Sequence, residues 1–517
     1  MNLNYKRTIL VGFAFFLISA FWQAYDATVP VILTNKFGMS QTWSGVIMAL
    51  DNILAVFMLP LFGALSDKCT SRFGKRTPFI TIGTVVAAVA ILCLSFVDNA
   101  QLQNISAVAT IDDPAALEII YETQADTSLL TPEGDTVVLR DSFTKEEFTA
   151  IRCKVIDPQS GKTITNPDYT NYVAPARQAY AAAKTAENSM PLILFICLLL
   201  VVLIAMATFR SPAVAVMPDV TMKPLRSKAN AIINLMGTGG GILVLVLGMV
   251  FSTSAVQNAM MSYTVYYAVI ASIMLTALLI FLCTVREPKW AAEMAADSVK
   301  YGIEETVSDN AEHRSLSVAE KKSLICILLS ITLWYFGYNA VTSKYAVYAG
   351  NILDKDYNTT MLLAQAAAIV AYLPAGTIAS KIGRRKTILA GIVMLAAAFG
   401  CAAFMRSSSP TLAMNILFAL AGVAWATINV NSFPMVVEMC SGADVGKYTG
   451  FYYTASMSAQ IVTPMLSGFL MDQMGMTVLF PYAAIFVALA FVTMSMVKHG
   501  DAKIAAKKGL EAFAEED

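Results

Sequence analysis

Long apolar segments recur along this chain, and most are separated only by short polar loops. A helix needs about 20 mostly apolar residues to cross the hydrocarbon core of a bilayer, and twelve segments meet this condition. The repetition predicts an all-α membrane protein with twelve transmembrane helices. The segments are residues 8–34, 43–66, 78–97, 190–209, 229–252, 262–285, 323–347, 359–380, 387–405, 411–437, 446–470 and 477–497.

The composition excludes several classes of protein. Of the 517 residues, 57% are hydrophobic and only 14% are charged, and the formal net charge is zero, whereas soluble proteins carry about 25% charged residues. A soluble or disordered chain is therefore excluded, and there is no basic surface that would bind nucleic acid. The chain contains no phosphate-binding loop, no metal-ligand motif and no nucleophile with a base nearby, so we expect no enzyme, no metal and no cofactor.

The distribution of basic residues predicts the orientation in the membrane. If the N-terminus lies inside, the cytoplasmic segments collect 25 of the 36 Lys and Arg residues, as the positive-inside rule requires. The short outer loops then hold only Lys36, Lys344, Lys355 and Arg406. We expect a multi-pass protein of the cell membrane with both termini in the cytoplasm.

Loop motifs recur at fixed offsets and indicate an internal duplication. Gly74-Lys-Arg and Gly383-Arg-Arg lie 309 residues apart, whereas Asp219 and Glu438 lie 219 residues apart. The offsets differ by 90, close to the 92 residues of the acidic, polar segment 98–189. The chain therefore reads as two six-helix halves with an extracytoplasmic insertion between the third and fourth helices of the first half. The expected domains are 1–97 with 190–285, the insertion 98–189, a cytoplasmic linker 286–322, the second half 323–497 and a cytoplasmic tail 498–517.

The loop after the second apolar segment reads GALSDKCTSRFGKRTPF. Its Asp67, Arg72 and Gly74-Lys-Arg resemble the corresponding loop of the major facilitator superfamily. The long spacing from Asp67 to Gly74 is similar to the form in glycoside–pentoside–hexuronide:cation symporters and sucrose:proton symporters. The segment after the fourth span, with Arg210 and Asp219, and Gly446-Lys-Tyr-Thr-Gly are similar to the same group. One departure is Ser380, which stands where an acid would mirror Asp67.

The resemblance covers nearly the whole chain outside the insertion, and it implies a function. Members of this group are secondary active transporters, so it implies symport of a sugar or glycoside with a proton or sodium ion by alternating access. That coupling ion would be the only cofactor, and the partners would be the sugar and the lipid bilayer, with the protein acting as a monomer. The alternatives are an efflux transporter of drugs or metabolites on the same fold and a sugar sensor that does not transport.

Charged residues of the loops at the expected cytoplasmic side are candidates for a gate. Ion pairs there would form when the halves close on that side, and pairs that differ between two conformations bias the equilibrium between them. Positive-inside topology alone is the alternative explanation for the basic members. The predicted gate residues are Asp67, Arg72, Lys75, Arg76, Arg210, Asp219, Arg226 and Glu438.

Two acidic residues lie deep in the first two spans. Asp26 precedes the outer end of its span by eight residues, and Asp51 follows the outer start of the next span by eight. At 1.5 Å per residue, both lie about 12 Å below the outer ends of their helices. Ionisable groups at membrane depth are costly and are usually functional, so we predict that this pair binds the coupling cation. The alternatives are hydrogen bonding that only fixes helix packing and, for Asp51, a different span boundary that leaves this residue near water.

Neutral polar and aromatic residues form stripes inside several spans. A polyhydroxylated ligand needs neutral hydrogen-bonding groups and an aromatic ring for its apolar face. These stripes therefore favour a sugar site, with Gln460 as its most prominent member. The predicted substrate-binding residues are Gln23, Asn52, Tyr335, Tyr338, Asn339, Gln365, Asn429, Tyr453 and Gln460.

Overall fold

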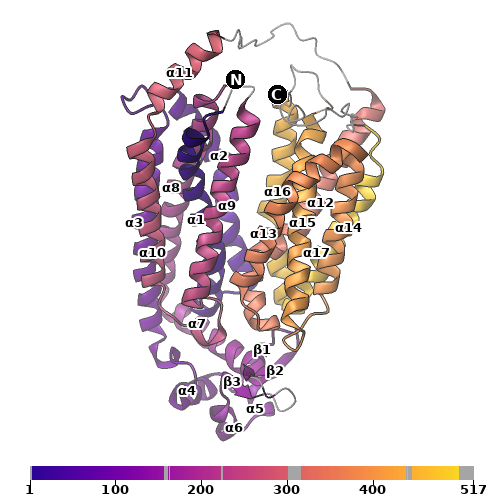
Figure 1. The fold of residues 1–517 in the computed structure, drawn as a ribbon. Coiled ribbons are helices and arrows are strands. Elements are labelled where there is room, and N and C mark those ends of the chain that lie inside the picture. The colour runs from indigo at the N-terminus through magenta and orange to yellow at the C-terminus, as the bar shows by residue number, and fades with distance from the viewer. Residues whose placement is uncertain are drawn as a thin grey trace.

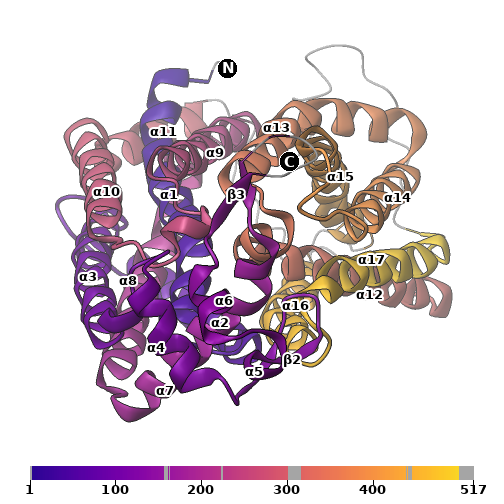
Figure 2. The ribbon, with the colours of Figure 1, turned by 90° about the horizontal axis from the view of Figure 1, so that it is seen from below.

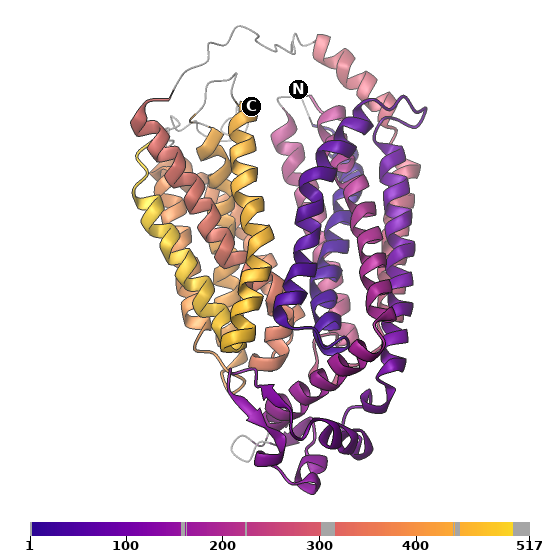
Figure 3. The ribbon, with the colours of Figure 1, turned by 180° about the vertical axis from the view of Figure 1, so that it is seen from behind.

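The computed structural model describes residues 3–156, 161, 163–222, 225–300, 316–437, 439 and 445–499. Long helices form two groups side by side, and a smaller part with strands covers one end of the bundle (Figure 1). Helix α1 begins and α17 ends at the opposite end (Figures 1 and 3). We call these two ends the insertion side and the terminal side.

Each group contains six long helices. The N-terminal half consists of α1 (Tyr5–Asn35), α2 (Gln41–Asp67), α3 (Thr77–Asn104), α8 (Met190–Val220), α9 (Arg226–Phe251) and α10 (Thr264–Thr284). The C-terminal half consists of α12 (Val318–Tyr348), α13 (Tyr357–Ile382), α14 (Arg384–Ala402), α15 (Thr411–Val437), α16 (Val445–Met474) and α17 (Leu479–Ser495). The amphipathic α11 (Glu287–Lys300) follows α10 on the terminal side (Figure 1).

All twelve predicted apolar segments are therefore helical. Ten helices in the described part of the chain are long and apolar enough to cross a membrane. The other two long helices, α13 and α16, have 26 and 30 residues and carry more polar side chains. Each half has its own buried apolar core, so each can be stabilised by its own packing.

Local signals explain where several helices begin. The side chain of Ser317 accepts a hydrogen bond from the amide of Glu320, and the Glu320 carboxylate accepts one from the amide of Ser317 at 2.9 Å. This reciprocal arrangement satisfies free amides at the start of α12. At the start of α13, the carboxylate of Asp356 alone caps the helix and accepts from the Thr359 amide at 2.9 Å.

The insertion is a folded unit with a core of its own. It contains two antiparallel hairpins and several helices around buried residues such as Leu117, Phe148 and Tyr180. Its elements are α4 (Pro114–Gln124), β1 (Ser128–Leu130), β2 (Thr136–Val138), α5 (Leu139–Ser142), α6 (Lys145–Ala150), β3 (Lys154–Ile156), β4 (Thr163–Thr165), a π-helix (Tyr169–Val173) and α7 (Ala174–Glu187).

Helix α3 continues seven residues beyond the predicted end of its apolar segment, as far as Asn104. The extension is held by buried polar contacts: both carboxylate oxygens of Asp98 accept from Lys36 Nζ at 2.7 Å, and neither side chain is exposed. Gln101 donates to the carbonyl oxygen of Lys36 at 2.8 Å. A hydropathy pattern ends where polar residues begin, so it does not detect a helix that continues through paired polar groups.

The insertion connects α3 and α8 of the N-terminal half, but it also contacts the C-terminal half. The amide of Met476 donates to the carbonyl oxygen of Pro132 at 2.8 Å, and the amide of Thr165 donates to Asp354 at 3.0 Å. Figure 2 shows the insertion lying across the end of the bundle, with β2 near α16 and β3 near α13. The insertion thus bridges the two halves on its side.

Candidate functional site

Two carboxylates of adjacent helices lie between the halves. Asp26 of α1 and Asp51 of α2 are half-buried and close enough to interact electrostatically. Asn52 donates to Oδ1 of Asp51 at 2.8 Å, whereas in the described part of the chain no hydrogen bond reaches the Asp26 carboxylate. No group of three or more metal-ligating side chains lies together among the described residues. Two neighbouring carboxylates can share one proton or one monovalent cation, because its binding removes their mutual repulsion.

Arg210 lies close to this pair and not at the end of its helix. The predicted apolar segment stops before Arg210, but α8 continues through an apolar stretch to Val220. The guanidinium is near enough to Asp51 and Tyr453 to interact with both electrostatically, and it lies 5.7 Å from the centre of the Trp22 ring. Asp51 therefore has a positive neighbour, so the two carboxylates have different surroundings.

Two predicted substrate residues meet across the interface of the halves. Nε2 of Gln365 in α13 donates to Oε1 of Gln23 in α1 at 2.6 Å, and Nε2 of Gln23 donates to the hydroxyl of Tyr357 at 3.2 Å. Gly241 of α9 faces these amides, because a Cβ at this position would lie 3.3 Å from Oε1 of Gln365. The interface thus presents amide groups where α1, α9 and α13 meet.

Aromatic side chains of the C-terminal half face the acidic pair. The rings of Tyr338 in α12 and Trp425 in α15 stack with centroids 3.6 Å apart and an angle of 5°. Tyr335 meets Trp425 edge-on at 5.2 Å. Tyr338 is near enough to Asp26 to interact with it electrostatically. A flat apolar surface therefore lies beside the carboxylates, and such a surface can pack against the apolar face of a sugar ring.

The other predicted substrate residues are more dispersed. Asn339 has a buried Nδ2 that finds no hydrogen-bond partner in the described part of the chain, and Asn429 lies one turn after Trp425 on α15. Tyr453 is 51% exposed. Gln460 donates to the carbonyl oxygen of Ser456 in its own helix at 3.4 Å, and among the described residues it makes no hydrogen bond to the other half.

Four of the eight predicted gate residues, Asp67, Lys75, Arg76 and Asp219, form a charged network on the terminal side. Arg76 binds Asp67, donates from Nε to Asp219 at 2.8 Å, and donates from Nη1 to the Ser66 hydroxyl at 2.5 Å. Lys75 Nζ lies 3.8 Å from the same Asp219. All these residues belong to the N-terminal half.

The other four predicted gate residues do not belong to the ion pairs of this network, and one of them, Arg210, lies near Asp51. Arg72 is exposed and covers the Phe73 ring at 4.7 Å. Arg226 is the first residue of α9, and Glu438 lies outside the described residues.

Two family models match separate parts of the chain. The one described as Major Facilitator Superfamily matches residues 353–513, and the one described as MFS/sugar transport protein matches residues 10–109. This chain belongs to the major facilitator superfamily. The resemblance inferred from the loop motifs is thereby confirmed, and a family of transporters agrees with the expectation that the chain is not an enzyme.

The overall structure agrees with this membership. The fold matches the inward open conformation of the xylose transporter XylE from E. coli with a TM-score of 0.58, over 98% of this chain and 99% of that chain, at 15% identity. It also matches the crystal structure of a D-xylose-proton symporter with a TM-score of 0.55, over 95% and 98% of the two chains, at 15% identity. These likenesses concern the fold and confirm the predicted all-α major facilitator architecture.

Short stretches of sequence match curated transport proteins. The Arabidopsis thaliana sucrose transport protein SUC4 is 34% identical over 60 residues, which are 12% of each chain. The Homo sapiens proton-associated sugar transporter A is 40% identical over 72 residues, which are 14% of this chain and 9% of that protein. The match thus spans about a tenth of the length of either relative.

Two charged residues that join the halves of this superfamily member were not among the predicted site residues. The Asp472 carboxylate of α16 accepts from the amides of Gln41 and Thr42 at 2.7 Å each. Lys344 of α12 is fully buried and donates to the carbonyl oxygen of Gln41 at 2.5 Å. The signal for both was present, since each is an ionisable residue within or beside an apolar segment. Their common partner at the start of α2 becomes visible only in the folded structure.

Glu287 is a third residue that the sequence patterns did not identify. Its buried carboxylate accepts from the amides of Arg76 and Thr77 at 2.9 Å and from the Thr77 hydroxyl at 2.7 Å. It therefore caps α3 and fixes the backbone of the residue at the centre of the charged network. Gly74 has a φ of 111°, and a Cβ there would lie 2.3 Å from this carboxylate. The positive φ and the close approach of the Glu287 carboxylate explain why position 74 is a glycine.

Proposed function

We propose that this protein is a secondary active transporter of a sugar or glycoside, coupled to a proton or a sodium ion. Membership of a superfamily of transporters supports transport, and the matches to proteins named as sugar transporters support the substrate class. The coupling ion is the only cofactor that the proposal requires. In this proposal the protein acts as a monomer in the cell membrane, with the terminal side in the cytoplasm.

The observation that carries the proposal is the composition of the surface between the halves. Amides of Gln23 and Gln365 come from opposite halves, and the stacked Tyr338 and Trp425 lie on the same side as Asp26. Neutral amides can bond sugar hydroxyls, and the rings can cover an apolar sugar face. A cation bound at the carboxylate pair would remove the repulsion between the two carboxylates beside this surface and so favour sugar binding. Bound sugar would favour cation binding by the same factor, and this coupling links the two ligands.

The contacts between the halves are concentrated toward the insertion side, which supports alternating access. Helices α2 and α16 approach closely there: a Cβ on Gly45 would lie 2.0 Å from the carbonyl oxygen of Pro464, and one on Gly468 would lie 2.1 Å from that of Gln41. On the terminal side, Tyr372 and Tyr453 are 38% and 51% exposed. We interpret this arrangement as the state that is closed outside and open toward the cytoplasm.

The test is uptake by proteoliposomes that contain the purified protein. A panel of radiolabelled mono- and disaccharides is offered under an imposed proton gradient and, separately, under an imposed sodium gradient. We expect at least one sugar to accumulate above its equilibrium level under one of the two gradients. Sugar uptake that only reaches the equilibrium level, whichever gradient is imposed, would indicate a uniporter. Extrusion of a non-sugar compound with no sugar uptake would overturn the assignment in favour of efflux.

A further inference from the structure

The insertion is attached to the N-terminal half by more than its two chain ends. A Cβ on Gly38, in the loop between α1 and α2, would lie 2.2 Å from the amide nitrogen of Ala182 in α7. Gln101 of α3 donates to the hydroxyl of Thr185 in α7 at 2.9 Å, and both side chains are buried. Helix α7 therefore packs directly against α3 and the α1–α2 loop.

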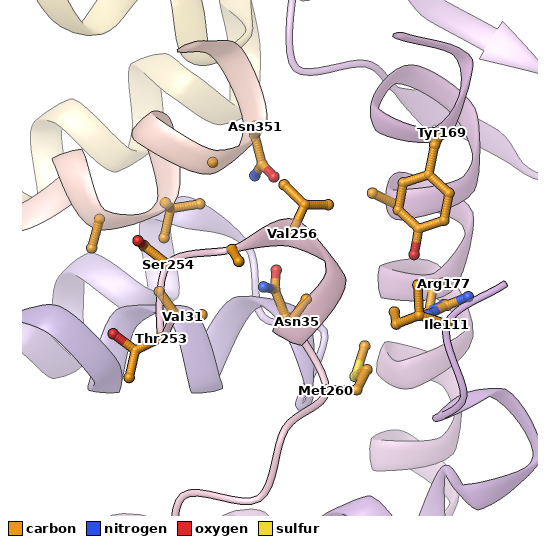
Figure 4. A pocket seen from close by; sticks show the side chains of 16 residues that line it. Val31, Asn35, Ile111, Tyr169, Arg177, Thr253, Ser254, Val256, Met260 and Asn351 are labelled. Atoms are coloured by element: carbon orange, nitrogen blue, oxygen red, sulfur yellow. The ribbon is translucent and has the colours of Figure 1, made fainter. Parts of the chain in front are cut away.

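The apolar contacts of the insertion lead to the same half. Val256 and Met260, from the connection between α9 and α10, pack against the core of the insertion. Together with Ile111 and Tyr169 of the insertion, they line the space shown in Figure 4. In the described part of the chain, no apolar residue of the C-terminal half packs against this core. Apolar burial thus joins the insertion and the N-terminal half into one body.

The turn between β1 and β2 meets the C-terminal half with its backbone. The amide of Met476, in the connection between α16 and α17, donates to the carbonyl oxygen of Pro132 at 2.8 Å. A Cβ on Gly134 would lie 2.4 Å from the carbonyl oxygen of Met474, and one on Gly475 would lie 2.4 Å from the Cα of Gly134. A side chain at either glycine would therefore hold the two backbones apart. We call this the turn contact.

The β3–β4 hairpin binds a carboxylate of the C-terminal half. Asp354, between α12 and α13, accepts hydrogen bonds from the amide of Thr165 at 3.0 Å and from the Thr165 hydroxyl. Lys154, the cross-strand neighbour of Thr165, has its Nζ 3.7 Å from the same carboxylate. We call this the hairpin contact. Both contacts are polar, so they can be broken without exposing an apolar core.

Both contacts lie on the side where the halves also touch directly. Asp472 binds the start of α2 there, and Asn358 of α13 donates to the hydroxyl of Thr253, just after α9, at 3.2 Å. Figure 2 shows the insertion lying across this end of the bundle as far as α13 and α16. Because the insertion stays with the N-terminal half, separation of the halves on this side has to break the turn contact and the hairpin contact as well.

We propose that the insertion restrains opening on the insertion side by holding the C-terminal half through these two polar contacts. The apolar contacts to the N-terminal half persist in both forms, whereas the polar contacts exist only in the closed form. The restraint lowers the population of the form that is open outside, and the apparent affinity of a ligand that binds this form falls with that population. The proposal rests on the alternating access of the proposed function and assigns control of that movement to a segment outside the twelve helices.

The test measures hydrogen exchange of the purified full-length protein in detergent, without sugar and without a gradient. The reporter is the peptide at the start of α2, whose amides at Gln41 and Thr42 bond Asp472 across the interface. Asp354→Gly removes the acceptor of the hairpin contact, and glycine fits the φ of 48° at this residue. Opening should become about tenfold more frequent, as expected for the loss of one or two hydrogen bonds. The reporter amides should exchange faster by the same factor.

A second variant breaks the other contact independently. Gly134→Asn tolerates a positive φ but places a side chain against Met474, so it should also speed exchange at the start of α2. The two effects should multiply in the double variant, because the contacts are separate. Asp126→Ala is the control, since it removes an exposed acid of the same insertion that pairs with Arg140 at 2.8 Å, and it should exchange as the wild type does.

Exchange in the buried middle of α3, around Ile91, distinguishes opening from unfolding and should keep its wild-type rate in all variants. Wild-type exchange at the start of α2 in the double variant, or an equal increase in the middle of α3, would overturn the proposal. Absence of sugar uptake would overturn the proposed function and would leave this result unaffected, because the readout involves no transport.

Discussion

At the residue scale, the two carboxylates differ in what surrounds them. Asp51 has the Asn52 amide and the Arg210 charge nearby, whereas Asp26 faces Asp51 and aromatic residues. A carboxylate without a positive partner has more to gain from a proton or a sodium ion. We therefore expect Asp26 to contribute more to coupling than Asp51, a distinction that their similar depth in the sequence did not suggest.

The first prediction concerns Asp26→Asn, which mimics the protonated side chain permanently. We expect uphill sugar accumulation in proteoliposomes to fall about tenfold or more. One bound ligand usually changes the affinity for a second ligand by a factor of this size, and the variant loses that effect of the cation. Counterflow exchange of the same sugar should survive, since it needs no net cation movement. The parallel variant Asp51→Asn should show a smaller loss of accumulation. If both variants accumulate sugar as the wild type does, the carboxylate pair has no role in coupling.

The second prediction concerns the amide that crosses the interface. Gln365→Leu removes an amide that bonds Gln23 and that, in the proposal, bonds a sugar hydroxyl. The KM for sugar should therefore rise about five- to tenfold, which corresponds to the free energy of one lost hydrogen bond. Gln178→Leu is the matched control, because Gln178 lies in the insertion, where its Nε2 donates to the carbonyl oxygen of Met39 at 3.1 Å. It should leave KM nearly unchanged. Equal effects on KM in the two variants would contradict the assignment of Gln365.

At the scale of elements, the first turn of α2 is held by side chains of the opposite half. The free amides at a helix N-terminus attract a carboxylate, and Asp472 supplies it from α16. Lys344 binds the carbonyl oxygen of the same Gln41. Opening on the insertion side must break these bonds together, so this contact between α2, α12 and α16 helps to set the energy of the closed form.

The third prediction follows from this contact. Asp472→Ala should leave the amides of Gln41 and Thr42 without their acceptor and increase hydrogen exchange in the peptide that covers the start of α2. Ser317→Ala removes a cap within the C-terminal half alone and is the control: exchange should increase at the start of α12 and not at α2. Unchanged exchange at α2 in Asp472→Ala would show that this carboxylate does not hold the closed form.

At the scale of the whole molecule, hydropathy and the duplicated loop motifs were enough to predict the architecture. Each of the twelve segments appears as a helix, because long apolar stretches have few alternatives in a membrane. The site was predicted only as separate residues. Gln23 and Gln365 were both identified by their depth in apolar segments, but they are 342 positions apart, and their contact depends on how the halves pack. Asp472 and Glu287 act on backbone amides of distant helices, which no local pattern reveals.

The insertion shows the same limit of sequence patterns. Its boundary was drawn where hydropathy falls, before Asp98, yet Asp98 and Gln101 are fully buried in α3 and bind Lys36. The rest of the insertion has its own core and meets the C-terminal half through polar contacts. The extension of α3 that is buried against Lys36 and the part that lies across the end of the bundle are therefore different segments.

The last prediction separates these two parts by comparing two deletions. Replacing residues 106–187 with a Gly/Ser linker retains Asp98 and the cores of both halves, so we expect a folded, monodisperse protein in detergent. Replacing residues 98–189 removes Asp98 and leaves Lys36 buried without its partner, and breaking such a pair costs about 3–5 kcal/mol. This second variant should aggregate or melt at a much lower temperature, and adding Lys36→Met should recover part of the loss. Size-exclusion profiles and melting curves provide the comparison. Equal stability of the two deletions would show that the buried ion pair is dispensable, and aggregation of the shorter deletion would show that the bundle requires the insertion itself.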